Sequence, residues 1–136
     1  MSTNSNCMPD TAAGRYLLLR TILDAAYDQA AHSKRRDSYN PDNDNFECQA
    51  ICEMDRRLPG GARYQAVKKI YESRVLELQD KNYEAVAELL GAVNYIAASA
   101  ITIMQSKNID LNHVLNPEKR SDTFTREFLG EDKEAA

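Results

Sequence analysis

Apolar residues recur along this chain at spacings of three and four positions, and no stretch alternates apolar and polar residues for long enough to indicate a β-strand. Such spacing puts apolar side chains on one face of an α-helix. The pattern predicts four main helices, at about residues 10–33, 46–58, 62–79 and 83–106, then a turn near 111–115 and a helix at about 122–129. The sequence therefore predicts an all-α fold, a small helical bundle of four main helices plus a short C-terminal helix.

Turn-forming residues separate these helices. Asp10 or Thr11 can cap the first helix, an Asn- and Asp-rich run at 37–45 follows it, and the Pro-Gly-Gly sequence at 59–61 ends the second. A chain of 136 residues fits around one core. We expect a disordered N-terminal segment at 1–9, a single helical domain at 10–129 and a solvated, charged tail at 130–136.

Each of the first three helices has one face on which apolar residues gather, and we expect that face to point into the bundle. In chain order these faces comprise Leu19, Ile22, Leu23, Ala26 and Ala30; Phe46, Ala50, Ile51, Met54 and Leu58; and Ala66, Val67, Ile70, Tyr71, Val75 and Leu78. Lys68 and Lys69 fall on the other side of the third helix, which is expected to face water.

The fourth helix is apolar on nearly all sides. Between residues 85 and 104 its distinctly polar residues are Glu88, Asn94, Ser99 and Thr102. A helix of this kind is either the centre of a bundle or a membrane span. Because Glu88 and Asn94 lie near its middle and the rest of the chain is polar, we expect a buried bundle helix and no membrane association.

Composition and charge narrow the function further. Hydrophobic residues make up 43% of the chain, charged residues 28%, and the net charge is −4. An acidic chain provides no positive field for non-specific nucleic-acid binding. Three cysteines, Cys7, Cys48 and Cys52, and a start without an export signal favour a reducing compartment, so we expect the cytoplasm. The two histidines lie too far apart to complete a zinc site with cysteine, and no metal site or nucleophilic grouping is predicted.

A polar set on the fourth helix is the first candidate site. Glu84, Glu88, Gly91, Asn94 and Tyr95 lie within four turns. A buried acid beside a small residue and an amide can hold Mg²⁺ or a polar ligand. The structural alternative is that Gly91 allows close helix packing, Glu88 is paired by Lys68 or Tyr64, and Asn94 fixes the register between helices.

Residues 84–115 resemble the last part of the MazG-type all-α nucleoside triphosphate pyrophosphohydrolases. Glu88 matches the Glu of that family's Glu-x-x-Asp motif, Asn94 and Tyr95 match a following Asn-Tyr pair, and the Asn-Ile-Asp-Leu sequence at 108–111 matches a turn. The resemblance implies metal-binding carboxylates. The set is incomplete here, because Gly91 occupies the position of the motif Asp and the earlier Glu-x-x-Glu motif has no counterpart among Glu47, Glu53 and Asp55.

A basic cluster around the Pro-Gly-Gly turn is the second candidate site. Arg56, Arg57 and Arg63 flank this turn, with Lys68 and Lys69 farther along. Guanidinium groups near the free N–H groups of a helix start suit phosphate. The alternative is a simple corner between helices with solvated arginines.

Two functions follow from these features. The first is a non-enzymatic helical binding protein, a homo-oligomer that occupies a protein partner or sequesters a small phosphorylated ligand. Small acidic helical proteins of this type are frequent among the accessory and inhibitory factors of phages and mobile elements. The alternative is a divergent nucleotide pyrophosphohydrolase, in which Glu84, Glu88 and one or more of Glu47, Glu53 and Asp55 hold Mg²⁺ and Arg57 or Lys68 neutralises phosphate. The broken acid pairs favour the first function, without enzymatic activity or cofactor.

Overall fold

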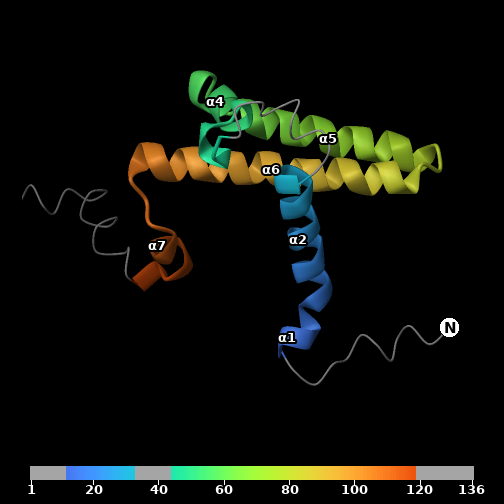
Figure 1. Cartoon of the computed structure of the whole chain (residues 1–136), viewed down its shortest axis with the longest axis horizontal. Coiled ribbons are helices and arrows are strands. Elements are labelled where there is room, and N and C mark those ends of the chain that lie inside the picture. Colours follow the sequence, from blue (N-terminus) through green and yellow to red (C-terminus); the bar gives the residue numbers. More distant parts are fainter. Residues whose placement is uncertain (1–11, 33–43, 119–136) are drawn as a thin grey trace, which may run out of the picture. The chain divides into compact units, whose positions relative to one another are not determined.

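The computed structural model describes residues 12–32 and 44–118. Of these residues, 85% are helical and none lies in a strand, which confirms the all-α prediction. The elements are α1 (Ala12–Arg15), α2 (Leu17–His32), the 3-10 helix η2 (Phe46–Cys48), α4 (Ala50–Arg57), α5 (Gly61–Leu78), α6 (Asn82–Lys107) and α7 (Leu111–Leu115) (Figure 1). The four main helices of the prediction correspond to α2, α4, α5 and α6. The helix predicted at 122–129 lies outside the described residues.

Two of the predicted helices are interrupted. The first breaks into α1 and α2 at Tyr16, and the second begins with the 3-10 turn η2 before α4 starts at Ala50. Contacts divide the chain into two units, the first ending at Ser99 and the second beginning at Ala100, within α6. The prediction of a single domain over 10–129 stays a prediction.

The second unit holds the end of α6 and α7. Asn108, with a φ of 53°, adopts the left-handed conformation that ends α6, and the Ile109 N–H donates to the Met104 carbonyl over 2.8 Å. The carboxylate of Asp110 then accepts from the Asn112 N–H over 3.0 Å and caps α7. This local pattern explains why the turn predicted at 111–115 forms a short helix.

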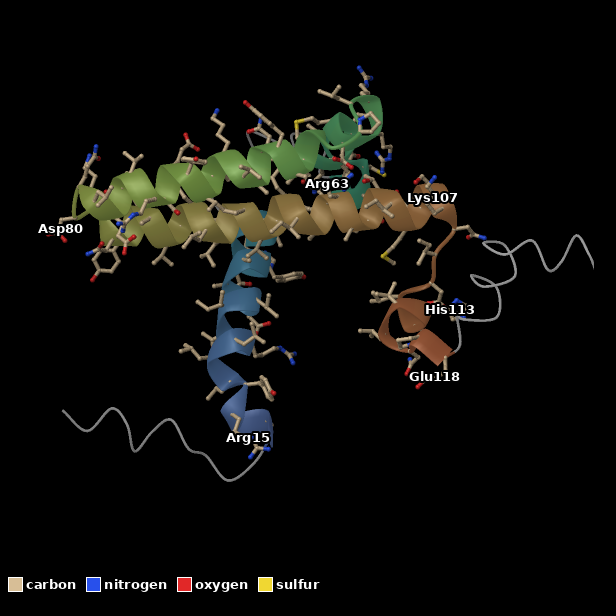
Figure 2. The ribbon with its side chains drawn as sticks, turned by 180° about the vertical axis from the view of Figure 1, so that it is seen from behind. Arg15, Arg63, Asp80, Lys107, His113 and Glu118 are labelled. Carbon is tan, nitrogen blue, oxygen red and sulfur yellow. The ribbon has the colours of Figure 1, made fainter. Side chains whose placement is uncertain are left out.

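Helices α5 and α6 form an antiparallel hairpin in the first unit, and they lie side by side in both views (Figures 1 and 2). Asp80 sits in the turn with a φ of 60°, while the Lys81 N–H donates to the Leu76 carbonyl over 2.8 Å and the Asp80 N–H to the Glu77 carbonyl over 3.0 Å. These two bonds satisfy the last carbonyls of α5. The chain therefore reverses within a few residues and brings α6 back along α5.

Small side chains, rather than large ones, are buried in the first unit. The fully buried apolar group consists of Cys52, Ala62 and Ala98, against which Phe46, Ile51, Met54 and Tyr95 pack. Among the described residues up to Ser99, the other buried ones are also small or polar, and they are Ala26, Asp55, Gly61, Ala66, Ser73, Ala85, Ala92 and Ser99. Because the distance between two packed helices depends on the side chains at their contact, such residues let the backbones approach closely.

The predicted inward faces are therefore wrong for most of their large residues. On α5, the side chains of Val67, Ile70, Tyr71, Val75 and Leu78 are exposed, with 47–75% of each residue accessible. On α2, Leu19, Ile22 and Leu23 are exposed, while Ala26 is buried. The physical reason is that α5 has two apolar faces. The face of small residues packs against α6, and the face of large residues lies opposite.

Helix α6 is not hidden inside the chain's own bundle. Within its most apolar 18-residue window, 22% of the residues are buried, and Val86, Leu89 and Ile96 are exposed. The expectation of a water-hidden central rod is thus wrong for the part of the chain that the structure describes. By length and composition α6 could cross a membrane, a property that core helices of water-soluble proteins share.

Candidate functional site

Lys69 lies at the centre of the polar set predicted on α6. Its Nζ is 3.3 Å from Glu88 Oε2, with both side chains about one quarter exposed, and it lies 5.9 Å from the centre of the Tyr95 ring. Tyr95 therefore adds a cation–π contact to the ion pair. The partner of Glu88 is Lys69, not Lys68 or Tyr64, and Lys69 faces α6 rather than water. We call Lys69, Glu88, Gly91 and Tyr95 the lysine clasp.

Gly91 provides the space that the lysine clasp needs. A Cβ at this position would lie 3.0 Å from Lys69 Cδ and 3.1 Å from Cε. The aliphatic part of Lys69 thus crosses α6 over the one position that lacks a side chain, and its ammonium group reaches Glu88. The structure supports the packing alternative for Gly91, and the contact is made with a lysine stem rather than with another small residue.

Asn94 makes a structural contact rather than lining an open site. Its Nδ2 donates to the Ala26 carbonyl over 3.0 Å, and Gln29 Nε2 donates to the Ala87 carbonyl over 3.2 Å. The two bonds join α2 and α6. Glu84, one turn before Glu88, is exposed. The structure therefore brings Glu88 and Tyr95 together at Lys69, whereas Asn94 joins α6 to α2.

At the corner between α4 and α5, the side chain of Asp55, a residue of α4, lies at the N-terminus of α5. Asp55 is 5% exposed, and its Oδ1 accepts from the Ala62 N–H over 2.9 Å and from Ser99 Oγ over 3.1 Å. A carboxylate at this position satisfies a free N–H group of the helix start and complements the helix dipole. Gly60, with a φ of 89°, makes the tight turn that brings the two helices together. The N-terminus of α5, which was expected to suit phosphate, is thus occupied by the carboxylate of Asp55.

The arginines beside this corner also have partners within the chain. Arg56 Nη1 is 3.1 Å from Glu53 Oε2, Arg56 Nη2 donates to the Glu47 carbonyl, and Arg57 Nε is 3.0 Å from Glu53 Oε1. Hydrogen bonds from Arg57 and then Arg56 lower the pKa of Glu53 below its ordinary value. Two of the five predicted cations are therefore engaged by one carboxylate.

Arg63 and Lys68 are exposed on α5. They belong neither to the lysine clasp nor to the group that Arg56 and Arg57 form with Glu53. Figure 2 places Arg63 near the α4 end of the hairpin, opposite the turn at Asp80. The predicted basic cluster is thus divided. Arg56 and Arg57 belong to α4, Lys69 belongs to the lysine clasp, and Arg63 and Lys68 lie on the outer surface of α5.

The acids of the hydrolase alternative are dispersed in the same way. Glu53 is paired with arginine, Asp55 caps α5, and Glu88 is paired with Lys69. Among the described residues, no three of His, Cys, Asp and Glu come together as a group that could hold a metal ion. Cys52 is fully buried, and burial raises the pKa of its thiol, whereas Cys48 is exposed.

Comparison of the chain with family models, curated proteins and solved structures found no match. Its function is therefore inferred from its own geometry.

Two rows of large apolar side chains lie on the surface, and all of their residues except Tyr64 were predicted to lie inside the bundle. The outer row of α5 comprises Tyr64, Val67, Tyr71, Val75 and Leu78, and the exposed row of α6 comprises Val86, Leu89 and Ile96. Beside the α6 row lies an open groove of about 270 Å³ lined by Ser73, Glu77, Asn82, Ala85, Val86 and Leu89. The three-and-four spacing identified the α5 residues other than Tyr64, but it could not tell an inner face from an outer one.

Proposed function

We propose that this chain is a non-enzymatic helical binding protein that acts through protein–protein association and works as a homo-oligomer. The observation that carries the proposal is the pair of apolar rows left exposed on α5 and α6. Soluble proteins rarely expose contiguous apolar patches of more than a few hundred Å², and larger ones mark interaction surfaces. A small helical protein with such rows acts by covering the surface of another protein, as accessory and inhibitory factors do.

The polar groups support association over chemistry. Glu88 lies against an ammonium group at 3.3 Å, and the Asp55 carboxylate accepts a backbone N–H and a hydroxyl. Releasing either group to a metal ion would leave a partly buried lysine or a helix start without its partner. The hydrolase suggested by the resemblance to MazG-type enzymes would need Glu88 and at least one acid of the η2–α4 segment, where Glu53 is paired with arginine and Asp55 caps α5. The phosphorylated-ligand variant is disfavoured in the same way, because Arg56 and Arg57 already bind Glu53.

The proposal is tested by incubating the full chain with a panel of nucleoside triphosphates, with and without Mg²⁺, and by resolving the products chromatographically. We expect every nucleotide to be recovered intact, and light scattering of the same sample to give a mass above the 15.3 kDa of one chain. The matched control is Glu88→Gln. Turnover that requires Mg²⁺ and disappears in Glu88→Gln would show that the chain is an enzyme and would overturn the proposal.

A further inference from the structure

The outer row of α5 has a symmetric arrangement. Tyr64 and Leu78 are each seven residues from Tyr71, and Val67 and Val75 are each four residues from it. The row therefore has the same spacing in both directions along the helix. When two such helices lie antiparallel, each large side chain of one meets a large side chain of the other, and Tyr71 meets its own copy at the centre.

We propose that two copies of this chain associate through the outer rows of their α5 helices, antiparallel and about a twofold axis at Tyr71. The proposal rests on the association function proposed above and names one partner for one surface, a second copy of the chain. In a twofold interface the same patch serves both subunits, so it must match itself. The symmetric spacing about Tyr71 meets that condition.

The exposed area of the row is comparable with the area that a standard interface covers. Its five residues are 51–75% exposed. Since a residue of these types exposes roughly 150–220 Å² when free, the row presents about 600 Å². A standard interface covers about 800 Å² on each partner, of which roughly 57%, or about 450 Å², is apolar. The total exposed area of the row is thus of the same order as the apolar part of such an interface.

Charges beside the row also match in the antiparallel arrangement. Lys68 and Glu72 lie along one side of the row, and Arg63 lies along the other side with Glu77, which also forms an ion pair with Arg74 of its own helix over 2.8 Å. In an antiparallel pair the same sides face each other. The position opposite Lys68 then lies two residues from Glu72 of the second copy. The position opposite Arg63 likewise lies two residues from Glu77 of the second copy. Opposite charges that flank an apolar seam select partner and orientation.

The lysine clasp keeps this face available. Because Ala62, Ala66, Lys69 and Ser73 turn toward α6 or are buried, the larger side chains of the same helix must turn outward. The exposed row of α6 is a separate surface and takes no part in the proposed contact.

Disulfide trapping tests the arrangement. The full chain is prepared with Cys7→Ser and Cys48→Ser, and the buried Cys52 is kept. In this background we expect Tyr71→Cys to form a covalent dimer under mild oxidation. Tyr64→Cys alone should not, because position 64 of the second copy lies 14 residues away, about 21 Å along the helix. A mixture of Tyr64→Cys with Leu78→Cys should cross-link. Tyr83→Cys, at an exposed position outside the row, measures random collisions.

A second measurement does not depend on disulfides. Tyr71→Glu places a charge at the centre of the seam, and sedimentation should show a dissociation constant raised at least 100-fold while the helical circular dichroism is retained. An unchanged constant would overturn the proposal. The proposal would also be overturned if Tyr71→Cys cross-linked no better than Tyr83→Cys. Cross-linking of Tyr64→Cys alone would overturn it too, because it would indicate a parallel pair. The nucleotide assay reports on the proposed function independently of these results.

Discussion

Gly91 is the position at which the hairpin can be perturbed most informatively. Replacing it with leucine puts four carbon atoms into the path of Lys69, whose Cδ and Cε would lie 3.0 and 3.1 Å from the first of them. The lysine must then leave the groove, and its ion pair with Glu88 and its contact with the Tyr95 ring are lost. The substitution thus tests whether the lysine clasp holds α5 and α6 in register.

The expected magnitude combines opposing terms. Leucine is favoured over glycine within a helix by about 0.8 kcal/mol. Overfilling a packed contact costs about 1–3 kcal/mol, and loss of a partly buried ion pair costs about 1 kcal/mol more. Gly91→Leu should therefore lower the free energy of unfolding by about 1–3 kcal/mol. Gly91→Ala should change it by less than about 0.5 kcal/mol, because a small displacement of the flexible lysine is offset by the better helix former.

The assay is urea unfolding followed by circular dichroism at one fixed protein concentration, so that association does not shift the midpoint. Three variants are compared: Gly91→Leu, Lys69→Ala and the double variant that carries both substitutions. With Lys69 shortened, the leucine has room and its cost should fall by about 1–2 kcal/mol. If the effects of the two substitutions add within about 0.5 kcal/mol, Lys69 is not what opposes a side chain at position 91, and the reasoning is refuted.

Two further substitutions test the ends of α5. Asp55→Ala removes the acceptor of the Ala62 N–H and of Ser99 Oγ, so thermal unfolding should show a loss of about 2–3 kcal/mol, against about 1 kcal/mol for Ser99→Ala. Equal losses in the two variants would mean that Asp55 does not cap the helix. Asp80→Gly should raise stability by about 0.5–1 kcal/mol, because Asp80 has a φ of 60° that glycine adopts without strain. Asp80→Ala is the control, and a glycine variant no more stable than the alanine variant would contradict this account.

The helices could be predicted from the sequence because their ends are encoded locally. Proline, glycine and Asn/Asp residues at 59–61 and 80–82 determine where α4 ends, where α5 begins and ends, and where α6 begins, and the predicted turn at 111–115 has the bounds of α7. Which face of α5 turns toward α6 could not be predicted in this way. Its apolar residues were assumed to form one inward face, and the largest were taken as the core. The structure instead buries Ala62 and Ala66, and it turns Tyr71 and Val75 outward.

The same assumption affected the candidate site. Lys69 was assigned to the water-facing side because it lies opposite the large apolar residues, and Glu88 was given other partners. The signal that could have identified the pair is the spacing of the small residues. Ala62, Ala66 and Ser73 define a second face of α5, and Lys69 lies on it. A register-fixing role was one of two alternatives given for Asn94, but its partner, the carbonyl of Ala26, is a backbone group that no side-chain pattern reveals.

A hairpin joined by alanine, serine and a lysine stem buries little apolar surface within a single copy. Most of the favourable free energy that hydrophobic contact can supply remains on the outside, where only another molecule can use it. Under the proposed assembly, dilution weakens the fold itself, because the unfolded chain competes with a solitary copy rather than with a pair. Surplus copies made without partners are then the first to be cleared by cellular proteases, which ties the abundance of this protein to its stoichiometry.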